Sequence, residues 1–167
     1  MAAPLKTGRR CRCGGFSLIE LLIAVAIIMI ILSVAIPSVR AMKQHTNATA
    51  AEGNLKTLAT VLSVYASNYP NIGCPATLAA LGPPASGSPA SSSAADLVDE
   101  SMAKASATPK QGYLYTYTPV SGTPCTSYAV TANPQPGAAT RYFFMDDTGA
   151  IHFNDNAPAT AASPVIQ

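Results

Sequence analysis

The longest apolar stretch of the chain, the 21 residues from Phe16 to Ile36, contains one carboxylate, Glu20. Insertion scales put the cost of an acidic side chain at the centre of a bilayer at roughly 2.5–3.5 kcal/mol. We therefore expect Glu20 to pair with a positive group once packed helices have replaced the lipid around it. Ion pairing is therefore the chemistry that Glu20 offers.

The other polar residues form no recognisable catalytic set. The sequence has no nucleophile–base pattern, phosphate-binding loop or zinc-ligand spacing. His45 and His152 are isolated and are expected on the solvated surface. Asp146, Asp147 and Asp155 offer oxygen ligands that suit calcium, but their spacing is not that of an EF-hand and Asp-Asp-Thr-Gly is common in turns, so they are weak candidates. We expect a protein that is not an enzyme and has no cofactor.

The four cysteines fall into two groups. Cys11 and Cys13 lie before the apolar stretch, whereas Cys74 and Cys125 lie far behind it. If the first two stay in the cytoplasm or are removed, Cys74 and Cys125 are the one pair left, and a disulfide between them would require an oxidising compartment. The alternative is two separate buried thiols.

The apolar stretch is long enough to cross a membrane. As a helix, 21 residues extend about 31 Å, which matches the hydrocarbon core of a bilayer. Four basic residues and no acidic residue precede it, so the positive-inside rule places residues 1–15 in the cytoplasm and the rest outside. The remainder has six basic and eight acidic residues, and nucleic acid is therefore not an expected partner.

Several kinds of export signal have this general layout. A cleaved secretory signal has a shorter apolar core, and Pro37 would hinder cleavage after the Ser33-Val34-Ala35 sequence. A lipoprotein signal has its cysteine after the core, and the context of Arg9-Arg10 is poor for twin-arginine export. A plain signal anchor remains possible, but it has no use for Glu20 or for the glycines before Phe16.

The segment "GGFSLIELLIAVAIIMIILSVAIP" resembles the prepilin leader and N-terminal helix of type IV pilins and type II secretion pseudopilins. In that family an inner-membrane peptidase cuts after a glycine and methylates the new N-terminal residue. The resemblance implies cleavage after Gly15, N-methylation of Phe16, an assembly role for Glu20 and a helix kink at Pro37. It implies a leader over residues 1–15 and a membrane-spanning, filament-core helix over residues 16–36.

The resemblance also implies a function and a location. The chain would be a pilin or pseudopilin, held by one membrane pass with its head in the periplasm and then built into a fibre. Its partners would be other copies, the prepilin peptidase, the inner-membrane assembly platform and the membrane. Cleavage would leave an amine on Phe16 one helical turn from Glu20. This amine could form an ion pair with Glu20 of a neighbouring copy or with Glu20 of the same copy. The alternatives are a minor pilin that binds DNA or a surface, and a plain membrane-anchored periplasmic domain.

The rest of the chain predicts an α+β head of pilin-like type. An amphipathic helix is expected over residues 37–69, with Pro37 bending or locally melting its start. Its apolar stripe has spacings of three and four residues and would pack on a sheet. The members of this stripe are Leu55, Leu58, Leu62, Tyr65 and Tyr69.

Short helices and an antiparallel meander are expected to follow. Residues 70–112 form a connector, with helices over 75–81 and over 94–105, the latter capped by Ser93. Residues 113–167 hold the sheet and a C-terminal tail. Three tyrosines alternate with other residues in "GYLYTYTP", which predicts the first strand. The next two strands are expected in "TSYAVTA" and "TRYFFMD", and Gly149 is expected in a hairpin turn.

Overall fold

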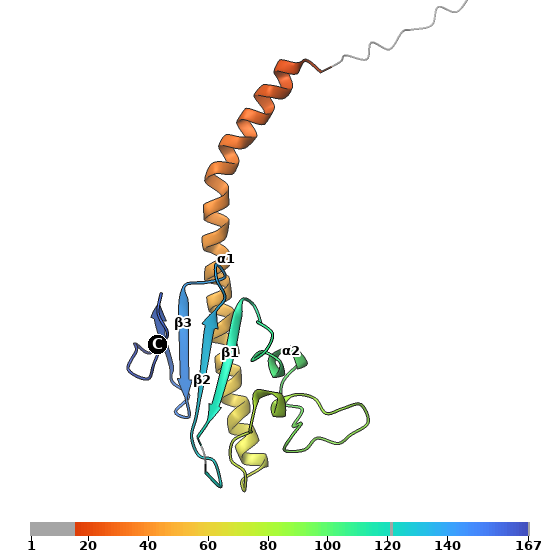
Figure 1. Cartoon of the computed structure of the whole chain (residues 1–167), viewed down its shortest axis with the longest axis vertical. Coiled ribbons are helices and arrows are strands. Elements are labelled where there is room, and N and C mark those ends of the chain that lie inside the picture. Colours follow the sequence, from red (N-terminus) through yellow and green to blue (C-terminus); the bar gives the residue numbers. More distant parts are fainter. Residues whose placement is uncertain (1–15, 121, 167) are drawn as a thin grey trace, which may run out of the picture. The chain divides into compact units, whose positions relative to one another are not determined.

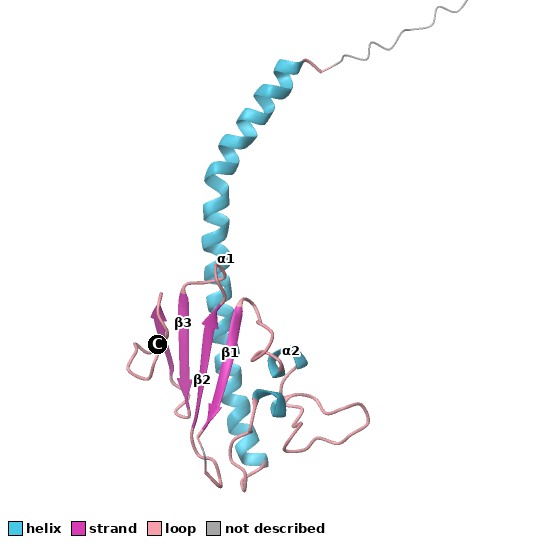
Figure 2. Ribbon diagram, viewed as in Figure 1, coloured by secondary structure: helices cyan, strands magenta, loops and turns pink. Residues whose placement is uncertain are grey.

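The computed structural model describes residues 16–120 and 122–166 of the chain. It separates into two units, Met1–Val39 and Arg40–Gln167. The predicted leader, including Gly15, Cys11 and Cys13, lies outside the described residues. Figures 1 and 2 show a long helix, α1, and a small sheet with short helices beside it.

Helix α1 runs from Leu18 to Asn68 and contains Pro37 in its interior. The helix is unbroken at that point, so the local melting considered for the proline is not found, whereas a bend there stays a prediction. Serine hydroxyls on both sides of the proline bond to the helix itself. Ser33 Oγ donates to the carbonyl of Ile30 at 2.7 Å, and Ser38 Oγ donates to the carbonyl of Ala35 at 2.8 Å.

The second unit is built around the apolar stripe of α1, as predicted. Leu55, Leu58, Leu62 and Tyr65 are at most 2% exposed, and Tyr69 packs at the edge of the same cluster. The stripe meets the inner face of the sheet in one continuous core. The sheet residues of that core are Tyr113, Tyr115, Val130, Ala132, Phe143, Met145 and Ile151.

The sheet is an antiparallel meander in the order β1-β2-β3-β4 (Figure 1). Its strands are β1 (Tyr113–Pro119), β2 (Tyr128–Pro134), β3 (Arg141–Asp146) and β4 (Ile151–Asp155). Burial alternates along the first three strands, which is the period of two expected when one face of a sheet covers a core. Gly149 has a positive φ in the β3–β4 turn, as predicted.

The connector differs from the prediction. It contains a 3₁₀ helix, η1 (Leu78–Leu81), and a single helical turn, α2 (Glu100–Ala103), whose N-cap is Asp99. The predicted helix over 94–105 with a Ser93 cap is wrong. The backbone N–H groups of residues 95–98 instead donate to the carbonyls of Ala80, Leu81 and Gly82, at 2.8–3.1 Å. Two of these donors, the N–H groups of Leu97 and Val98, would have made the first bonds of the predicted helix.

A disulfide joins Cys74 to Cys125, which confirms the predicted pair. It ties the segment after α1 to the β1–β2 loop. The backbone N–H of Cys125 also donates to the carbonyl of Ile72 at 2.8 Å. Gly73 has φ +82°, and a Cβ at this position would overlap the Cys125 carbonyl oxygen, so the two segments can approach this closely only at a glycine.

Both edges of the sheet carry additional backbone partners. At the β1 edge, Tyr115 N donates to the carbonyl of Ala105 at 3.0 Å, and Tyr113 exchanges two bonds with Lys110. At the β4 edge the C-terminal tail returns as an extra ladder: Phe153 N donates to Pro164 O at 2.9 Å and Ile166 N to Ile151 O at 2.8 Å. These contacts pair part of the backbone that a free edge strand would expose.

Candidate functional site

The N-terminal end of α1 holds Glu20 in the first turn of the helix. Its Oε2 accepts a hydrogen bond from the backbone N–H of Ser17 at 3.1 Å. Ser17 also accepts the first helical bond, from Leu21 N at 3.2 Å. A Ser-x-x-Glu sequence whose glutamate reaches back to the N-cap backbone is half of a capping box. The carboxylate is thus held beside the start of the helix, where the helix dipole favours negative charge.

The helix that follows is covered with apolar side chains that have no partner within the described chain. Leu18 is 81% exposed and Ile30 is 68% exposed. An exposed apolar surface of this extent marks contact with a membrane or with other proteins. Helix α1 is long and apolar enough at this end to cross a membrane.

Two of the isolated polar groups can now be placed. His45 is exposed, as predicted. The surface position expected for His152 is wrong, because its side chain is only 9% exposed. Its Nδ1 lies 2.7 Å from the carbonyl of Ser163, and its ring packs edge-on against Phe144. The C-terminal tail buries it by returning along β4.

The three weak calcium candidates are not brought together. Asp146 bonds to the backbone N–H of Thr148 in the β3–β4 turn, and Asp147 accepts from Ser127. Asp155 lies opposite Arg141, at the other end of the β3–β4 pair. Its Oδ1 accepts from Arg141 Nε at 2.8 Å, and this bond lowers the pKa of Asp155. Among the described residues no three His, Cys, Asp or Glu side chains gather as a metal site would require.

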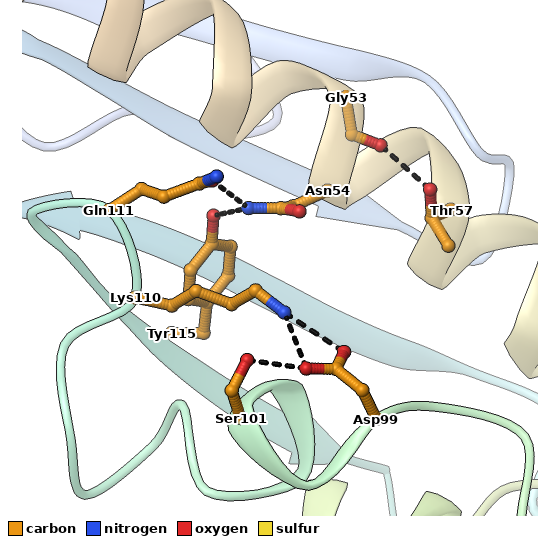
Figure 3. A network of polar contacts seen from close by, with 8 residues as sticks. All are labelled: Gly53, Asn54, Thr57, Asp99, Ser101, Lys110, Gln111 and Tyr115. Carbon is orange, nitrogen blue, oxygen red and sulfur yellow. Dashed lines mark hydrogen bonds and ion pairs between the residues drawn. The ribbon is translucent and has the colours of Figure 1, made fainter.

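A polar network fastens the connector to α1 and β1, as Figure 3 shows. Asn54 Nδ2 donates to Gln111 Oε1 at 2.9 Å and to the Tyr115 hydroxyl at 3.0 Å. Lys110 Nζ lies 2.9 Å from a carboxylate oxygen of Asp99. Hydrogen bonds from Ser101 and then Lys110 lower the pKa of Asp99 to about 2. The Asn54 bonds hold α1 against the connector and β1, and the Asp99 bonds hold two parts of the connector together.

The match to known proteins falls on the N-terminal end. Residues 10–36 match the family model described as the prokaryotic N-terminal methylation motif. The chain carries a prepilin-type signal. Comparison with curated proteins and comparison with solved structures each gave no match. The match ends at residue 36, so it identifies the N-terminal segment of this prepilin-type chain and does not extend into the head.

The prepilin-type signal includes the residues that the sequence singled out. Phe16 and Glu20 both lie within the matched range, as does Gly15, whose structure is not described. Their individual roles in cleavage, methylation and assembly stay predictions. The local bond between Glu20 and Ser17 was not anticipated, although the Ser-x-x-Glu spacing that signals a capping box stands in the sequence.

Proposed function

We propose that the chain is the precursor of a structural subunit of a type IV pilus or of a type II secretion pseudopilus. The observation that carries the proposal is the prepilin-type motif at residues 10–36, which overlaps the start of α1, where the apolar side chains are exposed. A four-stranded antiparallel sheet covering the C-terminal part of the same helix is the α+β arrangement expected of such a subunit.

Processing is the first step of the proposal. The prepilin peptidase cuts between Gly15 and Phe16 and methylates the new amine of Phe16. The Glu20 carboxylate already lies 3.1 Å from the backbone nitrogen of Ser17, the residue next to that amine. Cleavage therefore creates a positive charge close to the carboxylate, and each charge favours the ionised form of the other.

Assembly is the second step, and it uses the exposed helix. In the inner membrane the apolar side chains of residues 16–36 face lipid, which is as apolar as they are, so helix association depends on packing and on polar contacts. In the fibre, the helices of neighbouring copies replace the lipid. Glu20 then pairs with the Phe16 amine of a neighbour, because a buried charge without a partner costs several kcal/mol. The pair sets the register between neighbours.

The location follows from the same features. Before assembly the chain crosses the inner membrane once, with its head in the periplasm, and the assembly platform of that membrane moves it into the fibre. The Cys74–Cys125 disulfide agrees with a periplasmic head, because structural disulfides persist in oxidising compartments.

The proposal is tested by co-expressing the full chain with a prepilin peptidase and measuring the intact mass and N-terminus of the membrane-bound product. The wild type is expected to begin at Phe16 and to carry one added methyl group. Gly15→Val should leave the full precursor. Gly14→Val, the same change one residue earlier, is the matched control and should still be cut after Gly15. A wild-type product that begins at any other residue would overturn the proposal.

A further inference from the structure

A groove lies between the start of the head portion of α1 and the β2–β3 connection. Its volume is about 680 Å³. Arg40, Lys43, Gln44 and Asn47 line it from the helix, and residues 136–138 line it from the turn. Figure 1 shows this turn beside α1. The two sides are far apart in sequence, so only the fold brings them together.

The wall of this groove is fixed by hydrogen bonds. Asn47 Nδ2 donates to the carbonyl of Ala138 at 2.8 Å, and Gln44 Nε2 donates to that of Gly137 at 3.4 Å. Gly112 completes the wall with φ +79°, and a Cβ there would lie 2.7 Å from that of Ala138. The amides of Gln44 and Asn47 are thus committed to the turn, which leaves Arg40 and Lys43 as the charged groups that face a ligand.

The charge of the groove is positive and uncompensated. Among the described residues, no acidic side chain lines it. Within residues 16–120 and 122–166 the structure has four ion pairs, and neither Arg40 nor Lys43 takes part in them. Both side chains are exposed. The groove therefore suits an anion.

The place of the two cations along α1 indicates which anion they meet. Arg40 and Lys43 follow Ile36, the last residue of the apolar stretch, by four and seven residues. At 1.5 Å per residue these intervals are about 6 Å and 10 Å of helix. The headgroup layer on each side of a hydrocarbon core is roughly 5–8 Å deep. With Ile36 at the edge of the hydrocarbon, Arg40 is level with the lipid phosphates and the flexible Lys43 side chain reaches them.

We propose that this groove binds the phosphate-bearing headgroup of an anionic lipid while the subunit waits in the membrane. The inference rests on the membrane-resident stage of the proposed function, and it adds a ligand and a site. Arg40 and Lys43 supply the charge, and the hydrogen-bonded turn holds the opposite wall open. The bound headgroup fixes the depth of the head against the bilayer, and it must leave when the subunit enters a fibre.

The test uses the full chain in nanodiscs of phosphatidylcholine with a minor fraction of phosphatidylglycerol. Spin-labelled phosphatidylglycerol and spin-labelled phosphatidylcholine report the preference of the protein for the anionic lipid. The test variant is Arg40→Gln with Lys43→Gln. The matched control is Lys56→Gln with Lys104→Gln, which removes the same charge from lysines that pair with Glu52 and Glu100. The leader is the same in all three proteins, so any contribution from its basic residues cancels.

A basic residue near an anionic surface contributes roughly fivefold to binding. The preference of the test variant for phosphatidylglycerol should therefore be at least about fivefold lower than that of the wild type, whereas the control should equal the wild type. Added salt should weaken the wild-type preference more than that of the test variant. Equal preference in the wild type and the test variant overturns the inference. So does a loss of fibres in the test variant with its lipid preference intact, which would assign the groove to a second copy.

Vesicle flotation of the same proteins after an alkaline wash separates this inference from the proposed function. A chain that floats but shows no preference for phosphatidylglycerol overturns the lipid site alone. A chain that does not float overturns the membrane-resident stage as well.

Discussion

Gly73→Ala should be among the most damaging small substitutions in the head. Gly73 combines φ +82° with close contact to the Cys125 backbone. An alanine Cβ would overlap the carbonyl oxygen of Cys125 and lie 2.9 Å from its carbonyl carbon. Neither is the end of a flexible side chain, so the two backbone segments would have to separate. The nearby bond from Cys125 N to Ile72 O, at 2.8 Å, would be lost or stretched.

The magnitude follows from three contributions. A left-handed conformation costs a non-glycine residue roughly 1–2 kcal/mol. The lost hydrogen bond costs about 1 kcal/mol. Displacing a packed segment adds typically 1–3 kcal/mol. We therefore expect the free energy of unfolding to fall by about 4 kcal/mol.

Gly87→Ala is the matched control. Gly87 has nearly the same φ, +85°, but nothing lies within 4 Å of its Cβ position. Gly87→Ala should therefore lower the free energy of unfolding only by the cost of the left-handed conformation, about 1 kcal/mol. Both variants are made in the fragment Arg40–Gln167, a compact unit with its own core, and compared by urea unfolding under oxidising conditions. Losses that agree within about 0.5 kcal/mol would refute the close approach of Gly73 to Cys125.

Three further outcomes are expected. Glu20→Gln should insert into the membrane normally but give few fibres, because the carboxylate that pairs with the neighbouring amine is gone; normal fibre yield by electron microscopy would contradict the pairing. Replacing both Cys74 and Cys125 by serine should lower the free energy of unfolding by about 4 kcal/mol, from a sequence separation of 51 residues, and equal urea midpoints for this variant and the oxidised wild type would argue against a stabilising bridge. Burial raises the pKa of Tyr113 to about 12, so the folded head keeps this proton at pH values where the unfolded chain has lost it. The contribution of Tyr113 to the free energy of unfolding is complete below pH 10 and falls by at most about 2 kcal/mol by pH 12; a urea midpoint that does not change over this range would contradict the raised pKa.

Much of the fold could be predicted because its signals are local. The stripe from Leu55 to Tyr69 has the period of a helix, and the alternation in Tyr113–Pro119 has that of a strand. Each period is set by backbone geometry alone. The disulfide could be predicted by elimination, since the sequence offered one pair beyond the apolar stretch.

The failures have a common physical cause, which is pairing between distant segments. Residues 95–98 were predicted as helix because Ser93 offers an N-cap, but their N–H groups bond to the carbonyls of residues 80–82. His152 was predicted at the surface, but the returning tail covers it. The groove at Arg40 and Lys43 was missed for the same reason, because its opposite wall is about 90 residues away in the sequence. Local propensity carries no information about such partners.

The sheet edges of the head have backbone partners, whereas the apolar side chains of the N-terminal helix are exposed. This difference bears on how copies associate. A fibre could in principle form through sheet edges, but Lys110 and the connector take up part of the β1 edge, and the tail forms a ladder with β4. Adding a strand from another copy would first have to break these bonds. The apolar residues of the first unit have no such protection, from Phe16 at 84% exposed onward. Association through helices needs no bond of the head to break, so the fold itself favours the helix over the sheet as the contact between copies.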